Sequence, residues 1–211
     1  TVSSDTNRSN WSDFDNNDGA GIGGALYAGQ TLTLTGVDIR NSDNSGGEGG
    51  AAFAFLYADV SHAYFYKNSA NGSARSGGAI FINGNGKFEN VEFYKNYSAG
   101  SGGAIFSDNA SGRDLYLTSV TFRDNESGFR GGAVYTYNNL QADDVVFEDN
   151  YADGSGGAVY GKYNLTVENS VFTDNSSTSE GGAAYAGSDA YFDTVYFKSN
   201  SANRDGGAVS V

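Results

Sequence analysis

The chain has 211 residues, of which 25 are acidic and 12 are basic, so its formal net charge is −13. This balance excludes an electrostatic nucleic-acid binder, because phosphate contacts require clustered Lys and Arg. The absence of Cys and the single His exclude disulfides, thiolate chemistry and two-histidine metal motifs, and no apolar run is long enough to span a membrane.

The tripeptide Gly-Gly-Ala recurs along the chain and sets its organisation. Its first glycines are Gly23, Gly49, Gly77, Gly102, Gly131, Gly156, Gly181 and Gly206, separated mostly by 25 residues and otherwise by 26, 28 or 29. Counted from the first glycine of each repeat, called position n, aliphatic residues recur at n+3, n+9, n+11 and n+14, Phe at n+16 and Asn at n+19. A self-similar period of this length indicates a solenoid.

Each repeat contains short runs of alternating apolar and polar residues, and Gly, Asn, Ser and β-branched residues make helices unfavourable. We therefore predict an all-β, right-handed parallel β-helix of about eight coils, with three strands per coil and coils stacked ~4.8 Å apart. Residues 1–211 are predicted to form one β-helix domain. In chain order, residues 1–22 are an N-terminal cap or partial coil, 23–205 are seven full coils and 206–211 are an open C-terminal partial coil.

Two motifs recur together within single coils. Gly-Gly-Ala-Ile at residues 77–80 and 102–105 is followed by Phe-x-x-Asn at residues 93–96 and 122–125. These motifs resemble the polymorphic membrane protein repeats of chlamydial surface proteins, over roughly residues 14–208. The resemblance implies a right-handed parallel β-helix at the cell surface, in a family associated with adhesion and autotransport.

The recurring Gly and Asn residues have structural explanations. The Gly pair is predicted to form a corner that needs a positive φ and a close approach between coils. The Asn at n+19 is predicted to adopt the left-handed conformation and to stack on its equivalents as an amide ladder. The ladder comprises Asn68, Asn96, Asn125, Asn150, Asn175 and Asn200.

An aromatic column at position n+4 is the candidate binding site. Strand alternation lets only one of positions n+3 and n+4 face the core, and the n+3 column is aliphatic. We therefore expect the aromatic residues to face outward, as a flat surface for glycans or a neighbouring rod. Stacking for stability alone, or the opposite assignment of the two faces, stays open. The column comprises Tyr27, Phe53, Phe81, Phe106, Tyr135, Tyr160 and Tyr185.

Acidic residues also recur between coils. Asp124, Asp149 and Asp174 share position n+18, where stacked like charges destabilise a sheet unless a divalent cation bridges them. The alternative is solvated charge, because Lys67 and Lys95 occupy the same column. We expect no cofactor, with calcium as the open alternative.

Two weaker signals concern metal binding and catalysis. Residues 13–19 are similar to a calcium loop, but the glycine falls one position late. The adjacent pair Asp143 and Asp144 is predicted to lie several coils from His62, so no catalytic cluster is expected.

The two ends carry complementary parts of one coil. Phe14 and Asn17 continue the Phe and Asn columns, and joining two copies would place Gly206 28 residues before the next Gly23, as Gly49 lies before Gly77. An open solenoid end offers unpaired strands, so head-to-tail stacking into a filament is predicted. The residues expected to mediate it are Trp11, Phe14, Asn17, Gly206, Gly207, Ala208, Val209 and Val211.

The sequence therefore predicts a non-enzymatic structural protein, secreted or at the cell surface, whose partner is a second copy of itself. The alternative is an adhesin or passenger module of a longer surface protein that binds glycans, other surface proteins or a neighbouring cell. A polysaccharide-processing enzyme is the third interpretation. Neither nucleic-acid binding nor membrane insertion is expected.

Overall fold

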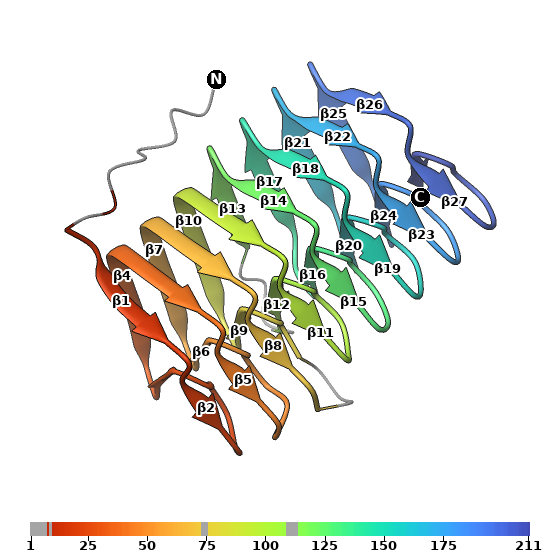
Figure 1. Cartoon of the computed structure of the whole chain (residues 1–211). Helices are drawn as coiled ribbons and strands as arrows, with labels where there is room; N and C mark the ends of the chain where they lie inside the picture. Colours follow the sequence, from red (N-terminus) through yellow and green to blue (C-terminus); the bar gives the residue numbers. More distant parts are fainter. Residues whose placement is uncertain (1–7, 9, 73–75, 109–113) are drawn as a thin grey trace.

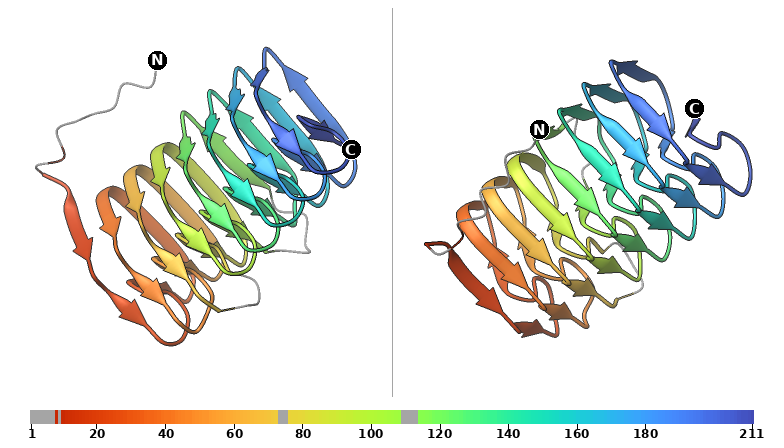
Figure 2. Two further views of the ribbon diagram at one scale, coloured as in Figure 1. Left: turned by 45° about the vertical axis from the view of Figure 1, so that its right-hand side comes forward. Right: turned by 45° about the horizontal axis from the view of Figure 1, so that its top comes forward.

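The computed structural model describes residues 8, 10–72, 76–108 and 114–211, which wind into a rod of successive coils (Figure 1). Each coil pairs in parallel with the next, and the stack keeps one axis in all three views (Figures 1 and 2). The described residues contain no helix, and so none that could cross a membrane. The predicted all-β parallel solenoid is confirmed.

Three parallel sheets run along the rod. The broad sheet has 12 strands, comprising β1 (Ser12–Asp15), β4 (Thr31–Arg40), β7 (Tyr57–Tyr66), β10 (Asn85–Tyr94), β13 (Leu115–Thr118), β14 (Thr121–Arg123), β17 (Leu140–Asp143), β18 (Val146–Glu148), β21 (Leu165–Glu168), β22 (Val171–Thr173), β25 (Ala190–Asp193) and β26 (Tyr196–Lys198).

The other two sheets have 8 strands each. The three-residue sheet follows the Gly-Gly-Ala corner and comprises β3 (Leu26–Ala28), β6 (Ala52–Ala54), β9 (Ile80–Ile82), β12 (Ile105–Ser107), β16 (Val134–Thr136), β20 (Val159–Gly161), β24 (Ala184–Ala186) and the shorter β28 (Val209–Ser210). The two-residue sheet precedes the next corner and comprises β2 (Asp18–Gly19), β5 (Asp43–Asn44), β8 (Ser69–Ala70), β11 (Tyr97–Ser98), β15 (Glu126–Ser127), β19 (Tyr151–Ala152), β23 (Ser176–Ser177) and β27 (Ser201–Ala202).

The broad sheet bends at one left-handed residue per coil. In β4, β7 and β10 this residue lies inside a ten-residue strand, as His62 does in β7 with a φ of 50°. From β13 onward the bend divides the strand in two, for example at Asp144 between β17 and β18. Three strands per coil were predicted, and the coils from β13 onward have four.

The core is narrow and built from repeated columns. The aliphatic n+3 residues Ile80, Ile105 and Val134 are fully buried in it. The n+16 Phe rings stack on one another through the interior with centroid separations of 4.6–5.0 Å, from Phe65 to Phe197. A few large residues per coil therefore suffice, because each ring packs against its equivalents in the neighbouring coils.

The predicted Asn ladder is present along the inside of the corner before the two-residue sheet. Asn125 shows the repeating pattern: its Oδ1 accepts hydrogen bonds from the backbone N–H and the Nδ2 of Asn96, at 3.1 and 3.0 Å. Its Nδ2 donates to the carbonyl oxygen of Phe93 and to Oδ1 of Asn150, at 3.0 Å each. The amides thereby satisfy backbone groups that burial removes from water.

The left-handed conformation predicted for these Asn residues was wrong by one position. The residue with positive φ is at n+18, for example Lys95 at 56° and Asp124 at 52°, directly before Asn96 and Asn125. The physical reason is that the chain changes direction at n+18, and this residue therefore takes the left-handed conformation. The following Asn can then point its amide inward along the ladder.

The Gly-Gly corner is built as predicted. The first glycine has a φ between 65° and 73°, as at Gly131 and Gly156. The second glycine lies against the backbone of the next coil, so that a Cβ on Gly132 would overlap the carbonyl oxygen of Gly157. Both glycines are therefore required by geometry.

Thr194 is a strained point in the bend of the last complete coil. Its φ is 56°, a conformation that is costly for a β-branched residue. The equivalent residues include Asn90 and Asn169, whose short amide side chains tolerate it. We expect Thr194→Asn to raise the free energy of unfolding by about 0.5–1 kcal/mol. Urea unfolding checks this, with the exposed Thr118→Asn, at a position without positive φ, as the control; equal stabilisation by both would contradict it.

Candidate functional site

The aromatic column lies outside the main core and forms a cluster of its own. The n+4 residues of successive three-residue strands pair directly, as Phe106 does with Tyr135. Their rings are parallel, with centroid separations of 4.6–5.6 Å from Tyr27 to Tyr185. Phe53, Phe81, Phe106 and Tyr135 make up a buried cluster separate from the aliphatic core.

The expectation of an exposed aromatic face was wrong for the central rings. Phe53, Phe81 and Phe106 are only 2–5% exposed and Tyr135 9%, whereas Tyr27 at the first coil is 59% exposed. Because each ring stacks face to face on the next, the flat surfaces are occupied by the column itself. Strand alternation distinguishes the two faces of a strand, but it does not report what covers the outer one.

Burial perturbs the phenols at the C-terminal half of this column. Desolvation raises the pKa of Tyr135 to about 12, and the neighbouring Tyr160 adds to the shift while Arg130 opposes it. Desolvation also raises the pKa of Tyr160, again opposed by Arg130, whose guanidinium lies 5.0 Å from the ring centroid. The neutral phenols are therefore part of the packing.

This shift predicts a loss of stability at high pH. The unfolded Tyr135 ionises near pH 10 and the folded one near pH 12, so its contribution is fully present below pH 10 and is lost as the pH rises toward 12. We expect the urea midpoint to fall over this range, and to fall less in Tyr135→Phe. The exposed Tyr27→Phe is the control. An identical pH dependence of wild type and Tyr135→Phe would contradict the prediction.

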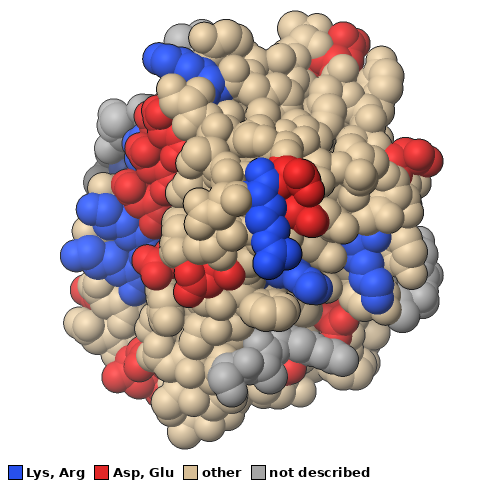
Figure 3. Space-filling model, turned by 90° about the vertical axis from the view of Figure 1, so that its right-hand side faces the viewer, with Lys and Arg blue, Asp and Glu red and all other residues tan. Residues whose placement is uncertain are grey.

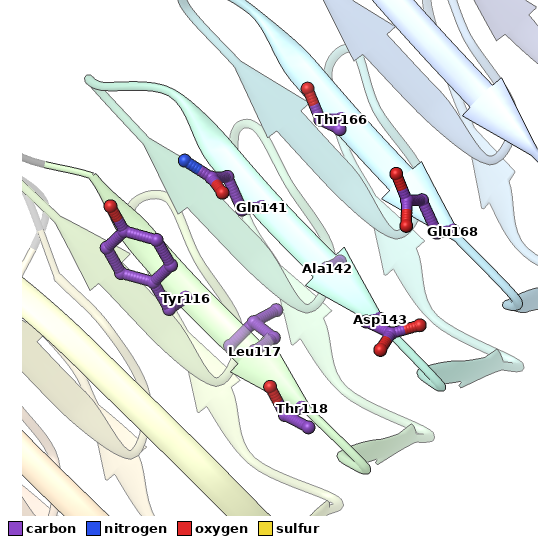
Figure 4. Close-up of a pocket in the computed structure, with 8 residues that line it drawn as sticks. All are labelled: Tyr116, Leu117, Thr118, Gln141, Ala142, Asp143, Thr166 and Glu168. Atoms are coloured by element: carbon purple, nitrogen blue, oxygen red, sulfur yellow. The ribbon is translucent and has the colours of Figure 1, made fainter.

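A shallow hollow lies on the outer face of the broad sheet, across strands β13, β17 and β21 (Figure 4). It has a volume of about 180 Å³, and we call it the polar groove. Its lining residues are Tyr116, Leu117, Thr118, Gln141, Ala142, Asp143, Thr166 and Glu168. Strand pairing places Tyr116, Gln141 and Thr166 in one row across the coils. Thr118, Asp143 and Glu168 form a second row beside it.

Asp114 orients one end of the polar groove. Its Oδ2 accepts hydrogen bonds from the hydroxyl of Tyr116 and from Nε2 of Gln141, at 3.4 and 3.2 Å, and its Oδ1 accepts one from Asn139 at 3.0 Å. The Tyr116 side chain is nevertheless 41% exposed. The row thus presents a positioned aromatic ring followed by an amide and a hydroxyl, a set of groups that sequence reasoning did not single out. In the sequence these residues share position n+10, which strand alternation places on the outer face, and comparing that position between coils could have identified the row.

The groove carries negative charge along one side. Asp143 and Glu168 are exposed and directly paired across β17 and β21, and Asp193 continues the row on β25. No Lys or Arg is among the groove's lining residues. Elsewhere the surface is mixed: on the face seen in Figure 3, acidic and basic side chains lie side by side around uncharged areas.

The acidic residues at n+18, Asp124, Asp149 and Asp174, lie at successive corners and each has a positive φ. Desolvation raises the pKa of Asp149, and the charges of Asp124, Glu148 and Asp174 add to this shift. Among the described residues, no three His, Cys, Asp or Glu side chains are grouped so as to hold a metal ion. The calcium interpretation therefore gains no support from the geometry of the described chain.

The residues predicted to mediate self-association lie in the first and last coils. Phe14 pairs with Ile39 and packs against the core, which confirms its place in the Phe column. Asn17 follows in the same turn, and its carbonyl accepts a hydrogen bond from Asp43. Trp11 lies beside Gly36 at the bend of β4.

The C-terminal residues continue the columns of the three-residue sheet. Val209 pairs with Ala184 and packs partly buried against the core. Gly206, Gly207 and Ala208 form the preceding corner, where the carbonyls of Gly206 and Ala208 accept hydrogen bonds from residues 182–184. Val211 is 72% exposed. These contacts are all within the chain.

These sheets and columns define a repeat protein of the parallel β-solenoid class. Four segments, residues 90–108, 144–162, 169–187 and 194–211, match the Chlamydia polymorphic membrane protein repeat, so the chain carries such repeats. Each segment begins at a left-handed bend residue, Asn90, Asp144, Asn169 or Thr194, and runs through the Phe strand, the Asn corner and the Gly-Gly corner. Each matched segment covers 18 or 19 residues, which is most of one turn but leaves out the first broad-sheet strand of each coil, such as β21.

One curated relative is similar over part of the chain. It is the probable autotransporter YfaL of Escherichia coli (strain K12), 34% identical over 125 residues. The match covers 54% of this chain and 10% of the relative, so the chain spans only about a tenth of that protein's length. No solved structure matches the chain.

Proposed function

We propose that this chain is a non-enzymatic, surface-exposed passenger module of an autotransporter-type protein, acting as an adhesin. The observation that supports this most directly is the match of four segments, each lying within one solenoid turn, to the polymorphic membrane protein repeat, together with the similarity to a probable autotransporter. A solenoid suits this role because it extends a surface outward with few core residues per coil.

Surface labelling tests this proposal in the organism that produces the chain. Antibodies raised against the folded chain should label intact cells, and external protease should remove the signal. A cytoplasmic protein of the same cells is the control for leakage. Labelling that appears only after the cells are permeabilised would overturn the proposal.

A second candidate function is end-to-end stacking with another copy. The last described coil presents partly buried core residues, including Phe192, Val195, Phe197 and Val209, on a side that no further described coil covers. A coil from a second copy would bury them and would pair with the open edge of β25 and β26.

Sedimentation and electron microscopy test the stacking. Concentrated protein should form rods longer than one chain, and Val209→Asp should shorten them, because a charge would be buried at the contact. Phe129→Asp, at a position that is 55% exposed in a middle coil, is the matched control. A strictly monomeric wild-type chain at high concentration would contradict the stacking.

A further inference from the structure

We propose that the polar groove binds an uncharged, extended polysaccharide that lies along the rod axis and contacts one coil per sugar residue. This inference rests on the proposed adhesin function and names the class of ligand. It assigns to the outer face of β13, β17, β21 and β25 a role that the aromatic column was expected to have.

The shape of the groove favours a polymer over a compact ligand. Its volume of about 180 Å³ is below the ~300–1,000 Å³ that encloses a drug-sized molecule, and the hollow is shallow and open. The same outward positions, however, recur from coil to coil. A chain molecule can therefore gain affinity by repeating a small contact, where a compact ligand cannot.

The spacing of the contacts favours sugar residues over amino acids. Paired residues of successive coils lie ~4.8 Å apart, close to the length of one pyranose in an extended polysaccharide, whereas an extended peptide advances only ~3.3 Å per residue. A peptide on this face would also cross the strands without backbone pairing, because β13, β17 and β21 beneath the groove are already paired on both sides within the sheet.

The side chains in the n+10 row provide the groups that recognise a sugar. Tyr116 lines the groove, and Tyr191 continues the same row one strand beyond the lining residues, on β25. They are 41% and 56% exposed, with Gln141 and Thr166 between them. The negative face of an aromatic ring attracts the C–H groups of a pyranose ring. The amide and the hydroxyl both donate and accept hydrogen bonds, as sugar hydroxyls require.

The second row of the groove, at position n+12, contains carboxylates, and their negative charge restricts the charge that a ligand can carry. The carboxylates of Asp143, whose Oδ1 also accepts a hydrogen bond from Asn169 at 2.9 Å, and of Glu168 can accept hydrogen bonds from sugar hydroxyls. Such charge-assisted bonds are stronger than neutral ones. Figure 4 shows both side chains on the outer side of the strands, beside the n+10 row. With no cation lining the groove, an anionic polysaccharide would be repelled. Among common polysaccharides, the groove therefore favours a neutral one over an anionic one.

Binding to defined oligosaccharides tests the proposal. The probes are linear hexasaccharides of neutral β-1,4-glucan, β-1,3-glucan and β-1,4-mannan, measured by calorimetry against oligogalacturonate and hexalysine. At least one neutral probe should bind, and the double variant Tyr116→Ala/Tyr191→Ala should weaken it about tenfold or more, since two stacking contacts are lost. Tyr196→Ala is the matched control, because Tyr196 is 59% exposed in the same coil but lies beyond the bend on β26.

The remaining outcomes decide against the groove. Binding of hexalysine alone, weakened by salt and by Asp143→Asn/Glu168→Gln, would show a basic peptide site instead. Binding of oligogalacturonate alone, or of a neutral probe equally by wild type and by the double variant, would also overturn the inference. Surface labelling of intact cells reports separately on the proposed function, so a surface-exposed chain that binds no neutral hexasaccharide refutes the groove alone.

Discussion

Replacing Gly132 by alanine is expected to destabilise the solenoid by at least about 3 kcal/mol, because the added methyl group has no space. The new Cβ would overlap the carbonyl oxygen of Gly157 and lie 2.6 Å from that of Tyr151. Both obstacles are backbone atoms, and the corner itself is tied to the next coil by the hydrogen bond from the Gly132 N–H to the Gly156 carbonyl at 3.1 Å. Rotating a side chain cannot remove this overlap, because the obstacles are backbone atoms. Removing it would require the backbones to separate and coil-to-coil hydrogen bonds to break.

The matched control is Gly21→Ala, where a Cβ would meet nothing within 4 Å. We expect it to change stability by no more than about 0.5 kcal/mol, as for other exposed positions. Urea unfolding followed by circular dichroism measures both variants. A Gly132→Ala protein as stable as the control would show that the coils can separate at this corner without cost, which would contradict the close approach of their backbones.

The sequence predicted the coil and its columns because both depend on a spacing that survives in every repeat. The Gly corner, the stacked Phe core and the Asn amide ladder each require one residue type at one position, so their recurrence identified them. The left-handed residue before each Asn escaped prediction, because Lys95, Asp124 and Ser199 share a backbone conformation but not a side-chain type. A search for recurring residue types therefore does not reveal a backbone conformation that different residue types share.

The candidate site was the part least predictable from the sequence. The aromatic column is conspicuous in the sequence as a recurring Phe or Tyr. Because an aromatic ring recurs in successive coils, the rings stack on one another, and this stacking covers the central rings of Phe81 and Phe106. The polar groove is less regular: Tyr116 and Gln141 are unlike, and they become neighbours only through strand pairing. Its hollow and its orienting Asp114 depend on side-chain packing that a single sequence does not report.

The second large effect is expected for Asn125→Ala, in the middle of the amide ladder. Asn125 is 1% exposed, and its removal deletes four hydrogen bonds. The backbone N–H of Asn96 loses its acceptor in a buried environment, and a buried unsatisfied group costs about 1–3 kcal/mol. With the cavity left by the lost side-chain atoms, we expect a total loss of about 3–5 kcal/mol. The exposed Asn71→Ala is the control, expected within about 0.5 kcal/mol.

Asn125→Asp separates the hydrogen-bonding role of this residue from its volume. The carboxylate keeps the acceptor for Asn96 but places a negative charge against the carbonyl oxygen of Phe93 and Oδ1 of Asn150, which now receive a donor at 3.0 Å each. The pKa of this buried aspartate should lie well above its usual value of about 3.9, because burial and the facing oxygens disfavour the charged form. Its protonated form can donate one of the lost bonds, so the variant should be most stable below pH 4 and lose stability as the pH rises through the folded-state pKa. Unfolding measured against the wild type at each pH checks this. A constant difference between Asn125→Asp and the wild type across that range would mean that the ladder position is hydrated, and that the amide stack does not hold neighbouring coils together.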